Sequence, residues 1–171
     1  MHATVRPATE ADASALVELR KKLFTETQFM LWEPAEFTQT AEDERKRIAT
    51  QYSRPTSLLL LAEEGTEAVG LLSAVGGERN RLRHVAVLAL GVTMSHWGQG
   101  IATAMLREAV AWSLGAGLKR LELTVHTSNI AAISVYLRCG FEVEGIRRSS
   151  LLVDGRYVDE YLMSLIHAHA G

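Results

Sequence analysis

The spacing of apolar residues changes near residue 57, and the part before it predicts two helices. Leu16, Leu19 and Leu23 recur at the spacing of one helical face. Thr9 is a residue type that caps helices, and an acid three residues later suits the positive end of the helix. The expected elements are a strand over 3–6, a helix from Glu10, an irregular apolar loop over 29–34 and a more polar helix over 41–51.

After residue 57 the pattern predicts a series of strands interrupted by two helices. The expected strands cover 57–63, 67–75, 84–93, 119–125, 141–153 and 157–166, and the helices begin near Gly100 and Ile130. The run over 84–93 is mostly apolar, which is typical of a central strand covered on both faces. Asp154-Gly155 indicates a tight hairpin. This order predicts one mixed α+β domain over 1–171, with helices on both sides of a single sheet.

Composition narrows the class of protein. The chain has 171 residues, of which 47% are hydrophobic and 22% charged, and its formal net charge is −2. Such a charge gives no general attraction to nucleic acid or to an anionic membrane. Cys139 is the single cysteine, and neither a signal peptide nor a membrane-spanning run is evident. We expect a soluble cytoplasmic protein without nucleic-acid or membrane partners.

Gly98 and Gly100 stand where the second half of the chain begins a helix, although glycine is a poor helix former. Helix starts carry unpaired N–H groups and a partial positive charge, so they bind anions when the backbone is accessible. Glycine leaves that backbone uncovered and permits unusual φ angles. The pair therefore predicts a phosphate-binding turn, with a tight ligand-free turn as the alternative.

Two common phosphate-binding motifs fit this stretch poorly. A Walker loop needs Gly-Lys followed by Ser or Thr, which the chain lacks here. A dinucleotide fingerprint has its first two glycines at Gly98 and Gly100, but Thr103 stands at the third position. Glu122 lies in the middle of an expected strand, whereas the ribose-binding acid belongs at a strand end. A nicotinamide-dependent oxidoreductase therefore stays a minor alternative.

The combined motif resembles the GCN5-related N-acetyltransferases. It comprises 91–93 (Gly-Val-Thr), 97–102 (Trp-Gly-Gln-Gly-Ile-Ala), 121–125 (Leu-Glu-Leu-Thr-Val), Asn129, Ala132, Tyr136 and Gly140-Phe141. The resemblance implies a mostly antiparallel twisted sheet of about seven strands flanked by about four helices, with the acetyl-CoA-binding part over about 57–166. Trp97 departs from the pattern, because that family usually has Gln or Arg at this position.

The resemblance also implies which residues hold the cosubstrate acetyl-CoA. Main-chain amides in the loop are expected to bind the pyrophosphate, and central-strand main-chain groups are expected to hold the pantetheine arm and polarise the thioester carbonyl. The residues so implied are Leu90, Val92 and Met94 in the strand, Trp97, Gly98, Gln99, Gly100, Ile101 and Ala102 in the loop, and Asn129. No metal ligand set is expected.

Asn129 and Tyr136 are seven residues apart, which places them on one helix face two turns from each other. By resemblance Tyr136 is the general acid that protonates the departing thiolate, a role that a phenol can fill. Its alternative is a core aromatic beside Phe141. Asn129 is either a ligand contact or a plain helix cap.

The general base stays open among Glu122, Glu33, Asp159, Glu160 and water. Strand alternation places Asp159 and Glu160 on opposite faces, so at most one of them points into a site. His126 follows the strand near the expected cofactor edge and is a further candidate for a functional role. Other histidines are expected to be structural or solvated, and His167 and His169 are expected to lie in a fraying tail.

The last hairpin narrows the resemblance to amino-acid N-acyltransferases of the phosphinothricin type. Polyamine and ribosomal-protein acetyltransferases share a similar hairpin, and a non-catalytic acyl-CoA-binding module is a further alternative. We expect direct acetylation of a small primary amine, such as an amino acid, and a homodimer is plausible. Arg147 and Arg148 are expected on a solvated strand face, where they could meet an anionic acceptor.

Overall fold

The computed structural model describes residues 3–168. Its strands are β1 (Thr4–Pro7), β2 (Leu58–Glu64), β3 (Glu67–Gly76), β4 (Val85–Val92), β5 (Arg120–His126), β6 (Glu142–Val153) and β7 (Arg156–Ile166). Its α-helices are α1 (Ala13–Glu26), α2 (Ala41–Tyr52), α3 (Ile101–Gly115) and α4 (Ile130–Arg138). Short 3-10 turns are η1 (Glu10–Asp12), η2 (Pro34–Glu36) and η3 (Met94–His96). None of the described helices is both long and apolar enough to cross a membrane.

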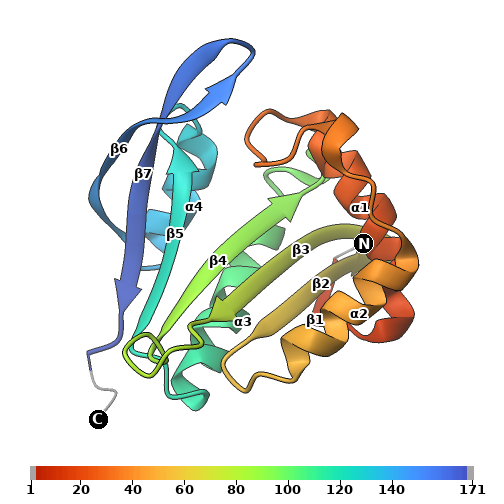
Figure 1. The fold of residues 1–171 in the computed structure, drawn as a ribbon, viewed down its shortest axis with the longest axis horizontal. Coiled ribbons are helices and arrows are strands. Elements are labelled where there is room, and N and C mark those ends of the chain that lie inside the picture. The colour runs from red at the N-terminus through yellow and green to blue at the C-terminus, as the bar shows by residue number, and fades with distance from the viewer. Residues whose placement is uncertain (1–2, 169–171) are drawn as a thin grey trace.

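All seven strands form one sheet in the order β1-β2-β3-β4-β5-β7-β6. Neighbouring strands are antiparallel except β4 and β5, which run parallel. Seven strands and four α-helices confirm the predicted mixed α+β class. Pairing between β4 and β5 covers only Val85–Val87 against Arg120–Glu122, after which the two strands diverge (Figure 1).

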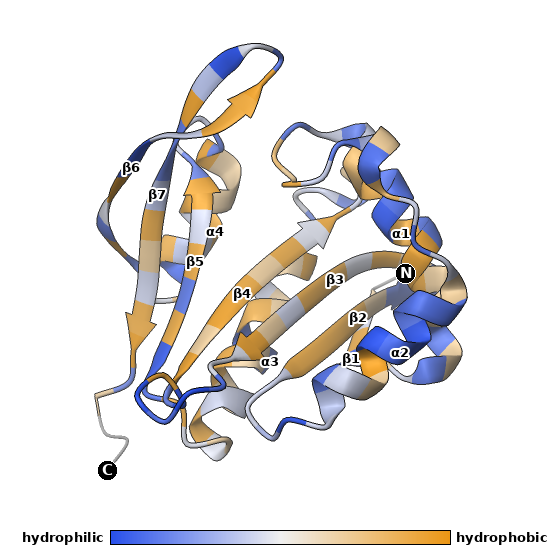
Figure 2. Ribbon diagram, in the orientation of Figure 1, coloured by the Kyte–Doolittle hydropathy of each residue, from blue (hydrophilic) through white to orange (hydrophobic). Residues whose placement is uncertain are grey.

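Helices cover the two faces of the sheet, and each side has its own core. One cluster joins α1 and α2 to the sheet through Leu16, Leu23, Ile48, Leu59 and Leu61. The other joins α3 and α4 to the opposite face through Met105, Leu106, Leu121, Tyr136 and Phe141. Figure 2 shows the apolar strands β2, β3 and β4 beside α1 and α2, which carry many polar residues. Because α1 and α2 sit over the first strands, they leave the α1 side of β5, β7 and β6 uncovered (Figure 1).

The first helix differs from its prediction in where it begins. Asp12 accepts hydrogen bonds from the N–H and hydroxyl of Thr9 at 2.7 and 3.0 Å, which closes a 3-10 turn before α1 starts at Ala13. Arg6 on β1 binds both oxygens of the same carboxylate, and this holds the pKa of Asp12 well below its usual range. Thr9 is therefore the N-cap of the 3-10 turn that starts at the predicted position, whereas α1 has Asp12 as its N-cap and begins three residues later than expected.

The expectation of a fraying tail is wrong for His167. Its main-chain N–H donates to Lys119 at 3.0 Å, and its imidazole Nε2 lies 2.8 Å from the hydroxyl of Ser113 on α3. The side chain is buried, because the last strand continues its main-chain bonding for one residue beyond β7. His169 lies outside the described residues.

Candidate active site

The divergence of β4 from β5 leaves main-chain groups of β4 without a strand partner. Thr93 donates its N–H to Val69 on β3, so it points toward that strand. Successive residues of a strand point their main-chain groups to opposite edges. Leu90 and Val92 therefore direct theirs toward the open edge beside β5, beyond the last pair at Val87. An extended ligand segment could hydrogen-bond to this edge.

The turn after β4 presents uncovered main chain at the start of α3. Gly98 and Gly100 have φ angles of +75° and +82°, in the left-handed region that favours glycine. A Cβ added at either residue would meet open space within 4 Å. The first main-chain bond of α3 runs from the N–H of Ala104 to Gly100, so the preceding N–H groups have no partner within the helix. This geometry fits a diphosphate.

Other predicted loop residues lie around this turn in different ways. Trp97 is half exposed, and its indole N–H donates to the carbonyl of Val92 at 2.7 Å, which ties the loop to β4. Gln99 donates its side-chain amide to the carbonyl of Ser95 at 3.2 Å. Ile101 is buried in the core and Ala102 follows it in the first turn of α3. The groups that these two residues contribute to the turn are therefore their main-chain N–H groups.

Met94 differs from Leu90 and Val92. Its N–H donates to the carboxylate of Glu26 at 2.7 Å, and its carbonyl accepts from the N–H of Trp97 at 3.2 Å. Both main-chain groups of Met94 are therefore engaged within the protein. Met94 lies in η3, beyond the end of β4, and only Leu90 and Val92 direct their N–H groups to the open edge.

On the α3 side of the sheet, Tyr136 lies in α4 and Asn129 immediately precedes this helix. The side-chain oxygen of Asn129 accepts from the N–H of Ala132 at 3.2 Å, so this residue caps the helix. Tyr136 is 7% exposed, and its ring centroid lies 6.0 Å from that of Phe141. Burial raises the pKa of Tyr136 to about 12. The phenol therefore keeps its proton at neutral pH and can donate a hydrogen bond.

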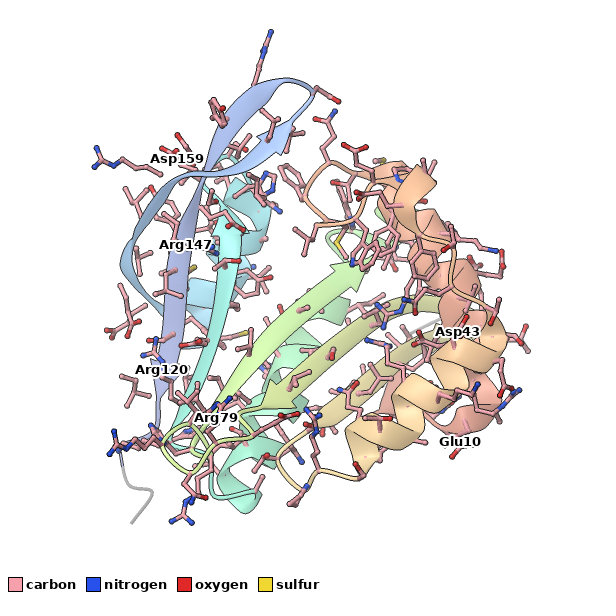
Figure 3. The ribbon with its side chains drawn as sticks, viewed as in Figure 1. Glu10, Asp43, Arg79, Arg120, Arg147 and Asp159 are labelled. Atoms are coloured by element: carbon pink, nitrogen blue, oxygen red, sulfur yellow. The ribbon has the colours of Figure 1, made fainter. Side chains whose placement is uncertain are left out.

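The opposite side of the sheet contains a cavity of about 400 Å³ where β4 and β5 diverge. Its walls come from β4, β5, β6 and β7 and are formed by Val87, Leu88, Glu122, Leu123, Thr124, Arg147 and Leu162. Glu122 faces this cavity, but its carboxylate accepts a hydrogen bond from Arg120 at 2.7 Å. Figure 3 labels Arg120 and Arg147 on this part of the sheet, with Arg147 nearer the hairpin tip.

Three further acids predicted as candidate bases occupy different environments. Glu160 is 6% exposed and accepts from Arg147 at 3.2 Å and from the hydroxyl of Ser150 at 2.7 Å. Asp159 accepts from the N–H of Ser149 at 2.8 Å. Glu33 is exposed, precedes η2 and is not among the residues that line the cavity.

Sequence reasoning gave too little weight to the apolar loop after α1 and to His126. A Cβ at Gly91 would lie 2.8 Å from Leu23 Cδ1 and 3.3 Å from Met30 Cε, so glycine lets the loop approach β4. The ring of Phe29 meets that of His126 on β5 at a centroid distance of 5.4 Å. Consecutive loop residues therefore contact both diverging strands. The run of apolar residues in this loop is evident in the sequence and indicates that the loop packs against something. The strands that it contacts could not be predicted from the sequence.

The same loop also reaches the hairpin at the far edge of the sheet. Gln28 donates its side-chain amide to the carboxylate of Asp154, which lies in the turn between β6 and β7. The open end between β4 and β5 is thus bounded by the loop after α1, by the hairpin and by the glycine turn (Figure 1).

A central parallel pair that opens beside a glycine-lined helix start is the arrangement expected from the resemblance to acetyl-CoA-dependent transferases. The model of the acetyltransferase (GNAT) family matches residues 18–141. The chain belongs to this family. Its members are N-acetyltransferases that use acetyl-CoA as acetyl donor, so the predicted enzyme class and cosubstrate are confirmed.

Relatives with different acceptors resemble the chain. It is 35% identical over 117 residues to the L-amino acid N-acetyltransferase AaaT of Escherichia coli, covering 66% of this chain and 70% of that protein. It is 30% identical over 160 residues to the N-alpha-acetyltransferase RimI of Mycobacterium tuberculosis, covering 94% and 90%. A GNAT acetyltransferase structure from Streptococcus pneumoniae superposes with a TM-score of 0.92 at 29% identity, covering 96% and 99%.

Proposed function

We propose that the chain transfers an acetyl group from acetyl-CoA to the primary amine of an amino acid or a similar small molecule. The observation that carries this proposal is the pairing of a cation and a carboxylate beside the cavity. Arg147 lines the cavity, and its guanidinium group donates to the carboxylate of Glu160 at 3.2 Å. The side chain of Arg147 is 55% exposed, so much of its guanidinium fork is accessible to an acceptor carboxylate. The resemblance to AaaT supports the same acceptor class.

Binding of acetyl-CoA is assigned to the α3 side of the opened sheet. The N–H groups around Gly98 and Gly100 would hold the diphosphate, and those of Leu90 and Val92 would hold the pantetheine arm. Bound there, acetyl-CoA supplies an activated thioester carbonyl. Tyr136 would donate its proton to the departing sulfur. Asn129 caps the start of α4. We also propose that it contacts acetyl-CoA directly.

The whole chain is proposed to act as one domain, because the single sheet takes strands from both ends of the described residues. The cytoplasmic location, the homodimer and the absence of nucleic-acid partners stay predictions from the sequence. Acetylation of protein N-termini is the second candidate function, because the resemblance to RimI covers 94% of this chain.

An acceptor screen tests the proposed function. The purified protein is given acetyl-CoA with L-amino acids, polyamines or short peptides that have free N-termini, and thiol release is measured. We expect the highest kcat/KM with amino acids. Higher values with peptides or polyamines would replace the proposed acceptor, and binding of acetyl-CoA without transfer to any amine would favour a non-catalytic module.

The role of Arg147 can be tested by comparing acceptors with and without a carboxylate. Replacing Arg147 with methionine should raise the KM for amino acids about tenfold, the effect of losing one charged hydrogen bond of about 1.4 kcal/mol. The KM for the matching amine that lacks the carboxylate should stay the same. Arg148→Met is the control, because this neighbouring arginine is exposed and does not line the cavity. Equal effects on both acceptors would remove Arg147 from carboxylate recognition.

A further inference from the structure

His126 lies at the end of β5, on the side of the sheet that carries the cavity. In the register of the sheet it pairs with Glu160 of β7, so the two side chains share a face. Its carbonyl accepts from the N–H of Asn129 at 3.0 Å, which fixes its main chain at the start of α4. The imidazole is therefore held where β5 has separated from β4.

The described part of the protein supplies no hydrogen-bond partner for the buried Nε2 of the His126 imidazole. The residue is 5% exposed, and Nε2 is the only buried side-chain nitrogen or oxygen without a hydrogen-bond partner within residues 3–168. Leaving such a group unpaired costs about 1–3 kcal/mol. Buried polar groups without partners are rare and call for an explanation. A ligand with a donor group would satisfy this atom.

Two candidate bases on the cavity side of the sheet, Glu122 on β5 and Glu160 on β7, are engaged by other donors. Glu122 is bound by Arg120, and Glu160 by Arg147 and Ser150. Each of these contacts occupies an acceptor position of the carboxylate that the acceptor ammonium group would otherwise use. His126 carries no such partner on Nε2.

Burial and the surrounding charges together set the protonation state of His126. Glu160 faces it from β7, and Arg147 of β6 lies beyond Glu160. Asp159, the next residue along β7, turns its side chain to the N–H of Ser149, and the loop after α1 contributes the uncharged ring of Phe29. Burial lowers the pKa of His126, and the negative charge of Glu160 opposes this shift. The imidazole is therefore neutral at pH 7 and able to accept a proton.

We propose that Nε2 of His126 accepts the proton of the acceptor ammonium group before acetyl transfer. This inference rests on the proposed function for the position of the acceptor on the cavity side of the sheet. It makes His126 a catalytic residue, and it makes Glu160 a positioning residue that tunes the basicity of the imidazole.

The step balances with the groups already assigned. His126 takes one proton from the ammonium group and later releases it to solvent. The freed nitrogen lone pair forms the new C–N bond, while the C–S bond breaks and its electron pair leaves on sulfur. Tyr136 gives its phenolic proton to that sulfur. The second proton lost by the nitrogen restores the phenol, so the products are the amide, the free thiol and one proton.

The test compares pH profiles of His126→Gln and wild type, using whichever amine the acceptor screen shows to be acetylated. We expect kcat/KM at pH 7 to fall roughly 10- to 30-fold, at the lower end of general-base effects because water can take the proton instead. Wild-type activity should also fall as pH drops through the pKa of His126, and this acidic limb should be absent from the variant. His84→Gln is the matched control, since His84 is exposed, immediately precedes β4 and does not line the cavity.

A second variant keeps the test informative if His126→Gln does not fold. Replacing Glu160 with glutamine removes the charge that raises the pKa of His126, so the acidic limb should move to lower pH. The pKa of the His126 ring, measured by NMR titration, should move in the same direction. An unchanged limb in Glu160→Gln, or a limb that persists in folded His126→Gln, would overturn the proposal. The failure of the proposed acceptor class would instead appear in the acceptor screen, independently of these profiles.

Discussion

Replacing Gly100 with valine is expected to raise the KM for acetyl-CoA by about 10²-fold, an effect of about 2.7 kcal/mol on binding. Gly100 has a φ of +82°, which a β-branched residue adopts only with strain of about 1–3 kcal/mol. The added side chain would also occupy the open space beside the N–H groups at the start of α3. Steady-state kinetics and calorimetry with coenzyme A would measure the loss.

Gly117→Val is the matched control for this change. Gly117 has a φ of +69° and open space around it, but it follows the other end of α3. Both variants should lose a similar free energy of unfolding, whereas only Gly100→Val should weaken acetyl-CoA binding. Equal KM values in the two variants would mean that the glycine turn does not hold the diphosphate.

Replacing Tyr136 with phenylalanine is expected to lower kcat by about 10²-fold, as for the loss of a general acid. Phenylalanine preserves the contact with Phe141, so the melting temperature and the affinity for coenzyme A should change little. Because burial raises the pKa of Tyr136 to about 12, the phenol stays almost fully protonated up to about pH 10. Wild-type kcat should therefore show no decline between pH 7 and 10 from ionisation of this phenol.

Tyr157→Phe is the control, because Tyr157 is exposed on the hairpin and far along the chain from α4. Its kcat should equal that of wild type. If Tyr136→Phe also turned over at the wild-type rate across the pH range, Tyr136 would be a core aromatic and another group would protonate the sulfur.

Much of the fold could be predicted from local patterns. The spacing of Leu16, Leu19 and Leu23 and the cap at Thr9 depend on neighbours in sequence, and the structure has the corresponding helix. The hairpin at Asp154-Gly155 is likewise a local turn. His167 was mispredicted because its partner Ser113 is 54 residues away, and terminal position alone says nothing about such contacts.

The candidate site could be predicted only where the motif is contiguous. The glycine turn was found because its two glycines and the helix that follows are adjacent in sequence. The environment of His126 could not be predicted in the same way, because its pairing with Glu160 depends on the register between β5 and β7. The engagement of Met94 by Glu26 also joins elements 68 residues apart. Registers and contacts of this kind are set by the packed fold and leave no local signal.

Within the described residues, the main-chain ladder between β4 and β5 joins the four-stranded part of the sheet to the three-stranded part. That ladder consists of three residue pairs at one end. Any molecule that binds the folded chain stabilises it by mass action. Acetyl-CoA bound between the diverging strands would contact both parts of the sheet where the ladder stops. Its binding would therefore raise the free energy needed to separate the four-stranded part from the three-stranded part.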